Sequence, residues 1–258
     1  MDRNLDDPMS EKTDLNRPSI PWLGAAVVGL AVLLGLLAVL AGFGSRWGIW
    51  HFRTGFTLLE WAARGALGVA VLSLPVLWFT RPGSGRRGFI LTLVGLALAL
   101  TVVAVPWQWR RTAATVPPIH DITTDTENPP AFVDVVPLRA DAPNPVEYAG
   151  SEVAQQQRAA YPDLRPVILD TPLEASFERA MEAVSRMGWE VVGTDPAAGR
   201  IEATDRTFWF GFRDDVVIRL TPSNGRTIVD VRSKSRVGRS DVGTNARRIR
   251  AYLDVLDR

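Results

Sequence analysis

Residues 171–194 read TPLEASFERAMEAVSRMGWEVVGT, and within this stretch the hydrophobic period changes from that of a helix to that of a strand. Thr171 to Glu174 form a capping-box pattern with proline at the first helical position, which predicts a helix start. Gly188 predicts the helix end, and 189–194 predicts a strand. The apolar residues between them have the i, i+3, i+4 spacing of a half-buried helix: Phe177, Ala180, Met181, Val184 and Met187.

On both sides of this stretch the sequence predicts further strands and two further helices. Polar residues 151–161 and amphipathic residues 241–257 are expected to be helical, and Asp214-Asp215 is expected to lie in a solvated hairpin turn. Strand patterns lie at 166–169, 199–204, 215–221 and 227–235, and 207–212 is aromatic and β-prone. The order β-α-β-β-β-β-α with short hairpins predicts an α+β domain over 151–258. It should have two layers, an antiparallel sheet and helices on one face.

A proline-rich segment, 117–150, precedes this soluble domain. Seven prolines lie between 117 and 145, and proline removes a backbone donor and fixes φ. A regular helix or a central strand is therefore excluded. Because 131–138 is largely apolar (AFVDVVPL), we expect the segment to run extended and to wrap on the domain.

Three apolar runs begin the chain and predict a membrane domain over 21–109. The runs 21–44 and 88–109 carry no charge, and 56–79 carries only Glu60 and Arg64. About 20 apolar residues are enough to cross a hydrocarbon core. Seven of the nine tryptophans lie in the first 109 residues, near the ends of these runs, as in the aromatic belts of membrane proteins.

The distribution of basic residues predicts the orientation of these spans. Six lysines and arginines lie in the tail 1–20 and the loop 80–87, against four on the opposite side. Since basic residues favour the cytoplasmic side, we expect a cytoplasmic tail over 1–20 and a C-terminal domain outside the cytoplasm.

Composition restricts the possible functions. The net charge of +1 combines ten basic and six acidic residues in 1–110 with 19 basic and 22 acidic residues in 111–258. An acidic domain held at a membrane argues against nucleic acid as a partner. The chain has no cysteine, which excludes disulfides, thiolate metal sites and a cysteine nucleophile. Nucleotide-binding and metalloprotease motifs are absent from the sequence, and we expect no cofactor.

One candidate catalytic group is present in the soluble part. His120 lies near Asp121 and Asp125, so a hydrolase-like acid–base site or a metal site could be built there. A second histidine is missing from this segment, and we expect no metal. The alternative is that the two aspartates make turn hydrogen bonds in a proline-rich loop.

A basic segment, 232–250, offers a candidate binding site. Seven basic residues accompany one acid where a predicted strand passes into the last helix. Free N–H groups at a helix start beside arginines suit an anion. In the alternative, Ser240 or Asp241 caps the helix, an arginine such as Arg236 pairs with Asp241, and the others are solvated. The predicted ligand-binding residues are Arg236, Arg239, Ser240, Asp241 and Asn245.

The same residues carry a family resemblance. IHDITTD at 119–125 with ENPPAF at 127–132 resembles the opening motif of the domain-of-unknown-function family 1499. RIEAT at 200–204, FWFGF at 208–212 and SRVGRSDVGTN at 235–245 resemble its later blocks, in order, so that the resemblance covers 117–256. It implies a domain found in bacteria and in plastid-bearing plants, here behind membrane spans, and it implies no activity.

Two functional hypotheses follow. The first is a non-enzymatic protein of the bacterial inner membrane whose outer domain binds an envelope protein or an anionic ligand, with the lipid bilayer as its other partner. The alternative is a membrane-bound, hydrolase-like enzyme that uses His120 with Asp121 or Asp125.

Overall fold

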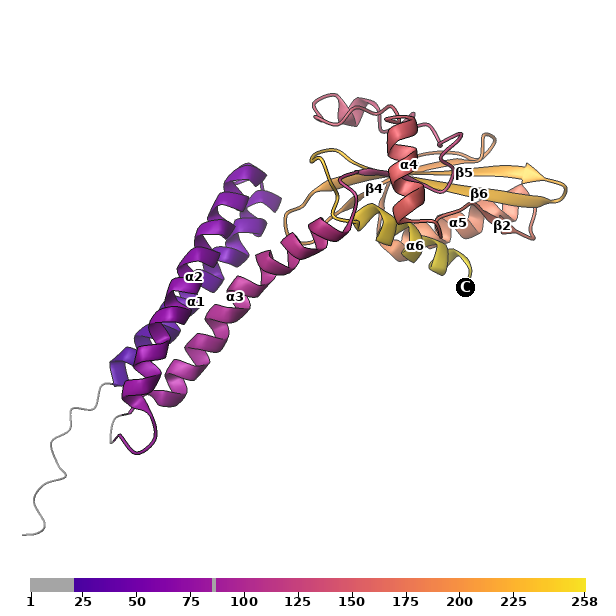
Figure 1. Cartoon of the computed structure of the whole chain (residues 1–258). Helices are drawn as coiled ribbons and strands as arrows, with labels where there is room; N and C mark the ends of the chain where they lie inside the picture. Colours follow the sequence, from indigo (N-terminus) through magenta and orange to yellow (C-terminus); the bar gives the residue numbers. More distant parts are fainter. Residues whose placement is uncertain (1–20, 85–86) are drawn as a thin grey trace, which may run out of the picture. The chain divides into compact units, whose positions relative to one another are not determined.

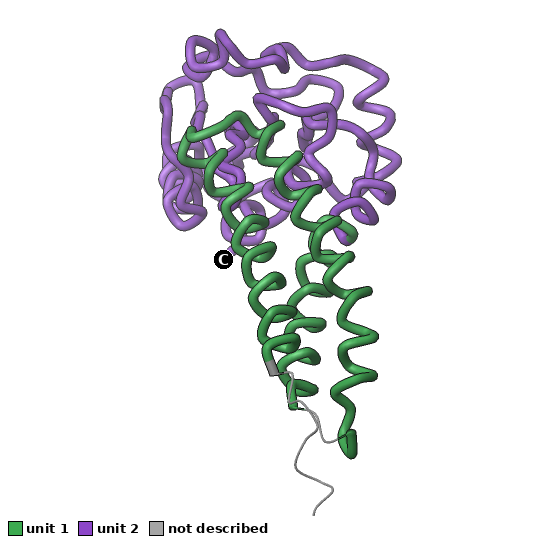
Figure 2. Tube along the Cα trace, turned by 90° about the vertical axis from the view of Figure 1, so that its left-hand side faces the viewer, with its two compact units in different colours: residues 1–107 green, residues 108–258 purple. Residues whose placement is uncertain are grey.

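The computed structural model describes residues 21–84 and 87–258. The chain divides into two compact units, the first ending at Trp107 and the second beginning at Gln108 (Figure 2). The tail predicted over 1–20 lies outside the described residues. Three long helices begin the chain: α1 (Pro21–Arg46), α2 (Phe52–Thr80) and α3 (Phe89–Thr115). All three are long and apolar enough to cross a membrane, as predicted.

Small residues allow the three helices to approach closely. Ala31, Ala66 and Ala99 come from different helices and are almost fully buried in one cluster. At Gly95 on α3, a Cβ atom would lie 2.9 Å from the backbone nitrogen of Val28 on α1, so only glycine fits there. Close backbone approach at small residues is how helices associate in lipid.

The second unit contains an antiparallel sheet in the order β1-β6-β5-β4-β3, with β2 also paired to β6 (Figure 1). Its strands are β1 (Asp121–Thr123), β2 (Val167–Leu169), β3 (Glu190–Asp195), β4 (Arg200–Arg206), β5 (Arg213–Ser223) and β6 (Arg226–Ser235). Its helices are η1 (Pro137–Arg139), α4 (Ser151–Ala160), α5 (Leu173–Met187) and α6 (Thr244–Leu256). The predicted α+β fold class is confirmed.

The two faces of the sheet have opposite character because side chains alternate along each strand. One face is apolar and packs against α5 and α6, which lie on the same side of the sheet (Figure 1). Trp189 stacks on Tyr252 of α6 in this core, with ring centroids 5.2 Å apart. The other face carries mostly charged side chains, and the proline-rich segment covers it: Phe132 and Val135 pack there on Val217.

The strand pattern around 207–215 differs from the prediction. Residues 207–212 form a closed turn between β4 and β5 rather than a strand, since the N–H of Thr207 donates to Phe212 and that of Phe212 to Thr207 Oγ1. Asp214 and Asp215 are buried inside β5 rather than solvated in a turn, and Asp214 accepts from Arg248 of α6 at 2.6 Å. Pairing with arginines allows both aspartates to be buried.

Two smaller predictions are also corrected. The capping box before α5 does not form: Pro172 is the N-cap, and Thr171 Oγ1 lies 2.7 Å from Ser176 Oγ instead. Strand β1 was not predicted from the sequence, because its three residues are too few to show an alternation of their own. They form a strand because β6 offers its edge, with Ile122 opposite Ser233.

Candidate functional site

The charged face of the sheet is built mainly by β6. Arg232 and Lys234 alternate along it with Ser233 and Ser235, which face the helices, and Arg236 follows directly after the last residue of the strand. Arg232 and Lys234 are almost fully buried. Buried cations need partners, because removal from water costs several kcal/mol per ion unless it is offset. The partners come from β1, β5 and the proline-rich segment.

Asp121 of β1 holds two of these cations. Its carboxylate accepts from Arg232 Nε at 2.9 Å and Nη2 at 2.8 Å, and from Lys234 Nζ at 2.8 Å. The antiparallel register places Asp121 opposite Lys234, so the pairing is built into the sheet. Arg232 also lies over the ring of Phe132, 4.9 Å from its centroid.

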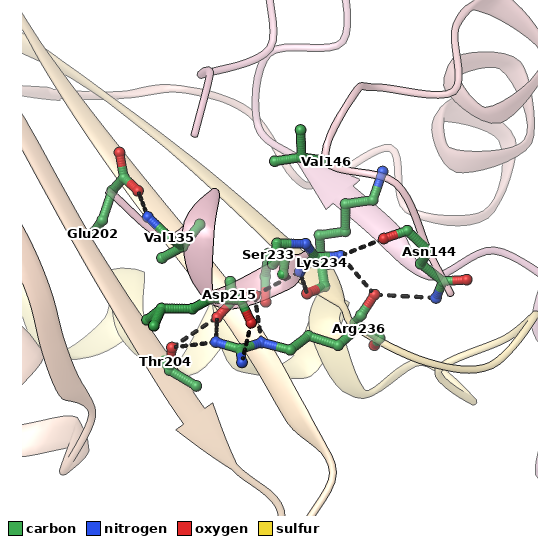
Figure 3. A network of polar contacts seen from close by, with 12 residues as sticks. Val135, Asn144, Val146, Glu202, Thr204, Asp215, Ser233, Lys234 and Arg236 are labelled. Carbon is green, nitrogen blue, oxygen red and sulfur yellow. Dashed lines mark hydrogen bonds and ion pairs between the residues drawn. The ribbon is translucent and has the colours of Figure 1, made fainter. Parts of the chain in front are cut away.

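Asp215 of β5 holds the third cation, Arg236 (Figure 3). It also holds Arg139 of η1. Arg236 donates to both carboxylate oxygens, at 2.7 and 2.9 Å, and Thr204 Oγ1 donates at 2.7 Å. Arg139 Nη1 donates at 2.5 Å. Burial alone would raise the pKa of Asp215, but the hydrogen bonds from Arg236, Thr204 and Arg139 outweigh it and lower that pKa.

Four basic side chains therefore share the two carboxylates of Asp121 and Asp215. Backbone carbonyls accept further hydrogen bonds: Lys234 Nζ donates to Glu147 at 2.5 Å, and Arg139 Nη2 to Ser235 at 3.2 Å. Arg139 Nε has no partner among the described residues. Burial lowers the pKa of Lys234, although Asp121 opposes the shift. This end of the charged face consequently holds more positive than negative charge, close to the loop that leaves β6.

Three of the five predicted ligand-binding residues have internal roles. Arg236 is bound to Asp215 rather than to Asp241. Asp241 accepts from the N–H groups of Gly243 at 2.7 Å and Asn245 at 2.8 Å, so its carboxylate occupies the start of α6. Burial raises the pKa of Asp241, against these two hydrogen bonds. The Asn245 amide is buried, where it joins Ser233, Ser235 and the His120 carbonyl.

The other two, Arg239 and Ser240, lie in the loop between β6 and α6. Ser240 Oγ accepts from the N–H of Val242 at 3.1 Å and is half-buried. Arg239 is exposed, and within 21–84 and 87–258 no carboxylate pairs with its guanidinium. Arg239 is thus the one residue of the predicted set that presents charge outward from this loop.

The three residues of the hydrolase-like hypothesis are not brought together. Asp121 is taken up by Arg232 and Lys234, and Asp125 accepts from Arg219 at 2.9 Å. His120 Nδ1 lies 3.5 Å from the Arg239 carbonyl, and burial lowers the pKa of this histidine. In the part of the chain that the structure describes, no group of three histidine, aspartate or glutamate side chains could hold a metal ion.

The most deeply buried ion pairs of this face were not predicted from the sequence. Arg139 stands in a proline-rich segment, and its partner Asp215 was assigned to a turn. The alternation of Arg232, Lys234 and Arg236, along β6 and just beyond its end, was an available signal, because cations on one face of a sheet require acids opposite them. A hollow of about 390 Å³ lies farther along this face, but Asp125 and Asp230 already hold its Arg219.

Comparison with known proteins identifies one family. A model described as "Protein of unknown function (DUF1499)" matches residues 121–256, a little more than half of the chain. The match begins with the first residue of β1 and ends with the last residue of α6, so it contains the whole sheet and the charged face. No curated protein matches the chain.

Proposed function

This chain belongs to the DUF1499 family, and from that premise we propose that it is a membrane-anchored binding protein of the bacterial envelope without catalytic activity. Its family domain takes an anionic group, on a free ligand or on an envelope protein, at the loop between β6 and α6. Arg239 is the residue that contacts this group. A guanidinium suits carboxylate and phosphate because it donates in a planar fork.

One observation carries the proposal: Arg239 extends outward beside a cluster in which four basic side chains share two carboxylates. A local excess of positive charge raises the concentration of anions near it and speeds their association. The start of α6 itself is not the proposed anion-binding site. Asp241 already occupies it, and a second anion beside that carboxylate would be repelled.

The positions of the candidate groups favour a protein without catalytic activity. A general base must reach the proton that it removes, within hydrogen-bonding distance or through one water. Asp121 and Asp215 are buried under arginines and the proline-rich segment. His120 has neither of its proposed aspartates as a partner, so the pair that would orient and activate it is missing.

The proposed location of the family domain is outside the cytoplasm, at the inner membrane. Three helices are long and apolar enough to cross a membrane, and a chain with three spans has its two ends on opposite sides. The excess of basic residues in the tail and in the loop 80–87 favours a cytoplasmic N-terminus. The family domain then lies outside the cytoplasm, anchored in the inner membrane, where it meets envelope proteins and lipid headgroups.

Charge reversal at Arg239 tests this function, with Arg226 as a matched control. Both arginines are exposed, and each Arg→Glu change alters the net charge equally, but Arg226 lies at the opposite end of β6. The full chain is crosslinked in its native membrane and purified. We expect specific crosslinked species with the wild type and Arg226→Glu, and their loss with Arg239→Glu. An identical set of species in both variants would refute the assignment.

A further inference from the structure

We propose that the turn between β4 and β5, residues 207–212, lies in the headgroup region of the membrane that anchors the chain, with Phe208 inserted among the lipids. The turn reads TFWFGF and is flanked by Arg206 and Arg213. Aromatic rings beside arginines are typical of segments that lie in a membrane interface, because rings enter the acyl boundary while arginines meet phosphates.

The turn is held in one conformation. The N–H of Thr207 donates to the Phe212 carbonyl at 2.9 Å, and the N–H of Phe212 returns to Thr207 Oγ1 at 2.8 Å. The N–H of Gly211 donates to the Thr207 carbonyl at 3.1 Å, and Gly211 has a φ of 70°, which glycine adopts readily. A turn closed in this way presents its side chains without further ordering on contact with lipid.

The aromatic side chains of the turn divide into an inner and an outer set. Phe210 is 3% exposed and stacks on Phe212, with ring centroids 5.6 Å apart. Phe208 is 78% exposed, the largest fraction among the large apolar side chains of the described residues. Moving an exposed apolar ring from water into lipid lowers its free energy, and the fixed turn holds this ring outward.

Trp109 indicates that the covering phase is the membrane. It is the last residue of the apolar run 88–109, where a tryptophan ring lies at headgroup level. From Gln108 onward α3 belongs to the second unit, and within that unit Trp109 contacts the turn. Its ring centroid lies 5.1 Å from that of Trp209 and 6.1 Å from that of Phe210. The turn therefore lies beside Trp109, whose ring is expected at the level of the lipid headgroups.

Spin labelling of the full chain tests this inference directly. The chain has no cysteine, so Phe208→Cys provides one labelling position, and Ile168→Cys on β2 provides an exposed control. Each labelled protein is reconstituted in vesicles of phosphatidylcholine and phosphatidylglycerol. Accessibility is measured to oxygen, which concentrates in lipid, and to a water-soluble nickel complex.

We expect the ratio of oxygen to nickel accessibility to be several-fold higher at position 208 than at position 168. Equal ratios at the two positions would show that the turn faces water and would overturn the inference. Shielding of position 208 from both reagents would overturn it as well, because protein rather than lipid would then cover the ring. Replacing an exposed side chain removes little packing, and near-UV circular dichroism checks that both proteins are folded.

Discussion

Arg139 and Asp215 form an ion pair that joins the proline-rich segment to the sheet: Nη1 lies 2.5 Å from Oδ2, and both side chains are almost fully buried. The two residues are 76 positions apart in the chain. Asp215 also binds Arg236 and Thr204, so one carboxylate connects η1, β4, β5 and the end of β6. The charged face depends on this connection, because the segment that brings Arg139 also shields the face from water.

Replacing Arg139 should strongly destabilise the second unit. Arg139→Met leaves Asp215 buried with one cation fewer, and breaking a buried pair from one side costs about 3–5 kcal/mol. Thermal and denaturant unfolding of the purified full chain, followed by near-UV circular dichroism, measures the loss. Arg186→Met is the control, since its exposed i, i+4 pair with Glu182 contributes only about 0.3–0.5 kcal/mol. Equal effects of the two changes would contradict this account of the ion pair.

Stability should fall on acidification, and Asp215 should account for part of the fall. Its pKa is lowered in the folded state, so its contribution is complete above the ordinary pKa of aspartate and is lost as the pH falls through the lowered value. The pKa of His120 is lowered as well, which adds a loss in the same direction as the pH falls below 6.5.

The matching measurement is the unfolding temperature of the wild type and of Asp215→Asn as the pH is lowered from neutrality. The variant is expected to start less stable and to lose less stability in the acid range than the wild type. Parallel curves for the two proteins would show that Asp215 is not ion-paired in the folded state.

Tyr161→Phe should leave the stability unchanged or raise it. The Tyr161 hydroxyl is buried beside the start of α6 and has no hydrogen-bond partner among the described residues. A buried polar group without a partner costs about 1–3 kcal/mol, so its removal is expected to change the free energy of unfolding by about 0 to +1 kcal/mol. Tyr252→Phe should instead lower the stability, because the Tyr252 hydroxyl donates to the Ala180 carbonyl at 3.3 Å. A substantial loss with Tyr161→Phe would reveal a partner for its hydroxyl.

The orientation of the chain can be read with fusions at its C-terminus. A reporter enzyme that matures only outside the cytoplasm should be active there, and one that works only in the cytoplasm should be inactive. Odd numbers of spans place the two ends on opposite sides, so the same reporters at the N-terminus should give the reverse result. Activity of the cytoplasmic reporter at the C-terminus would invert the proposed topology.

Sequence patterns predicted the elements whose period is local. The three apolar helices and the strands around 199–204 and 227–235 follow from hydrophobicity repeated along a few turns or residues. Residues 207–212 are β-prone because aromatic residues favour strands, whereas here Thr207 and Phe212 pair with each other and close a turn. Local propensity does not reveal that closure.

The candidate site was predictable only in part, for a related reason. Arg236 was recognised as a polar residue near a helix start, but the partner of its side chain, Asp215, lies on another strand. The β5–β6 register places Asp215 opposite Lys234, two residues before Arg236, and Arg139 arrives from a segment with no period of its own. Contacts between residues so far apart in the chain produce no regular spacing in the sequence. A buried carboxylate and a solvated one therefore have the same sequence pattern.

Photocrosslinking from position 240, next to Arg239, tests the central claim most directly. A photoreactive phenylalanine derivative is incorporated at position 240 of the full chain with Arg239 intact, and at the same position of the Arg239→Glu variant, and both proteins are irradiated in native membranes. We expect a discrete adduct from the protein with Arg239 that is absent from the variant. Adducts of the same identity and yield from both proteins, or an adduct from the variant alone, would contradict a binding function for Arg239 and the loop between β6 and α6.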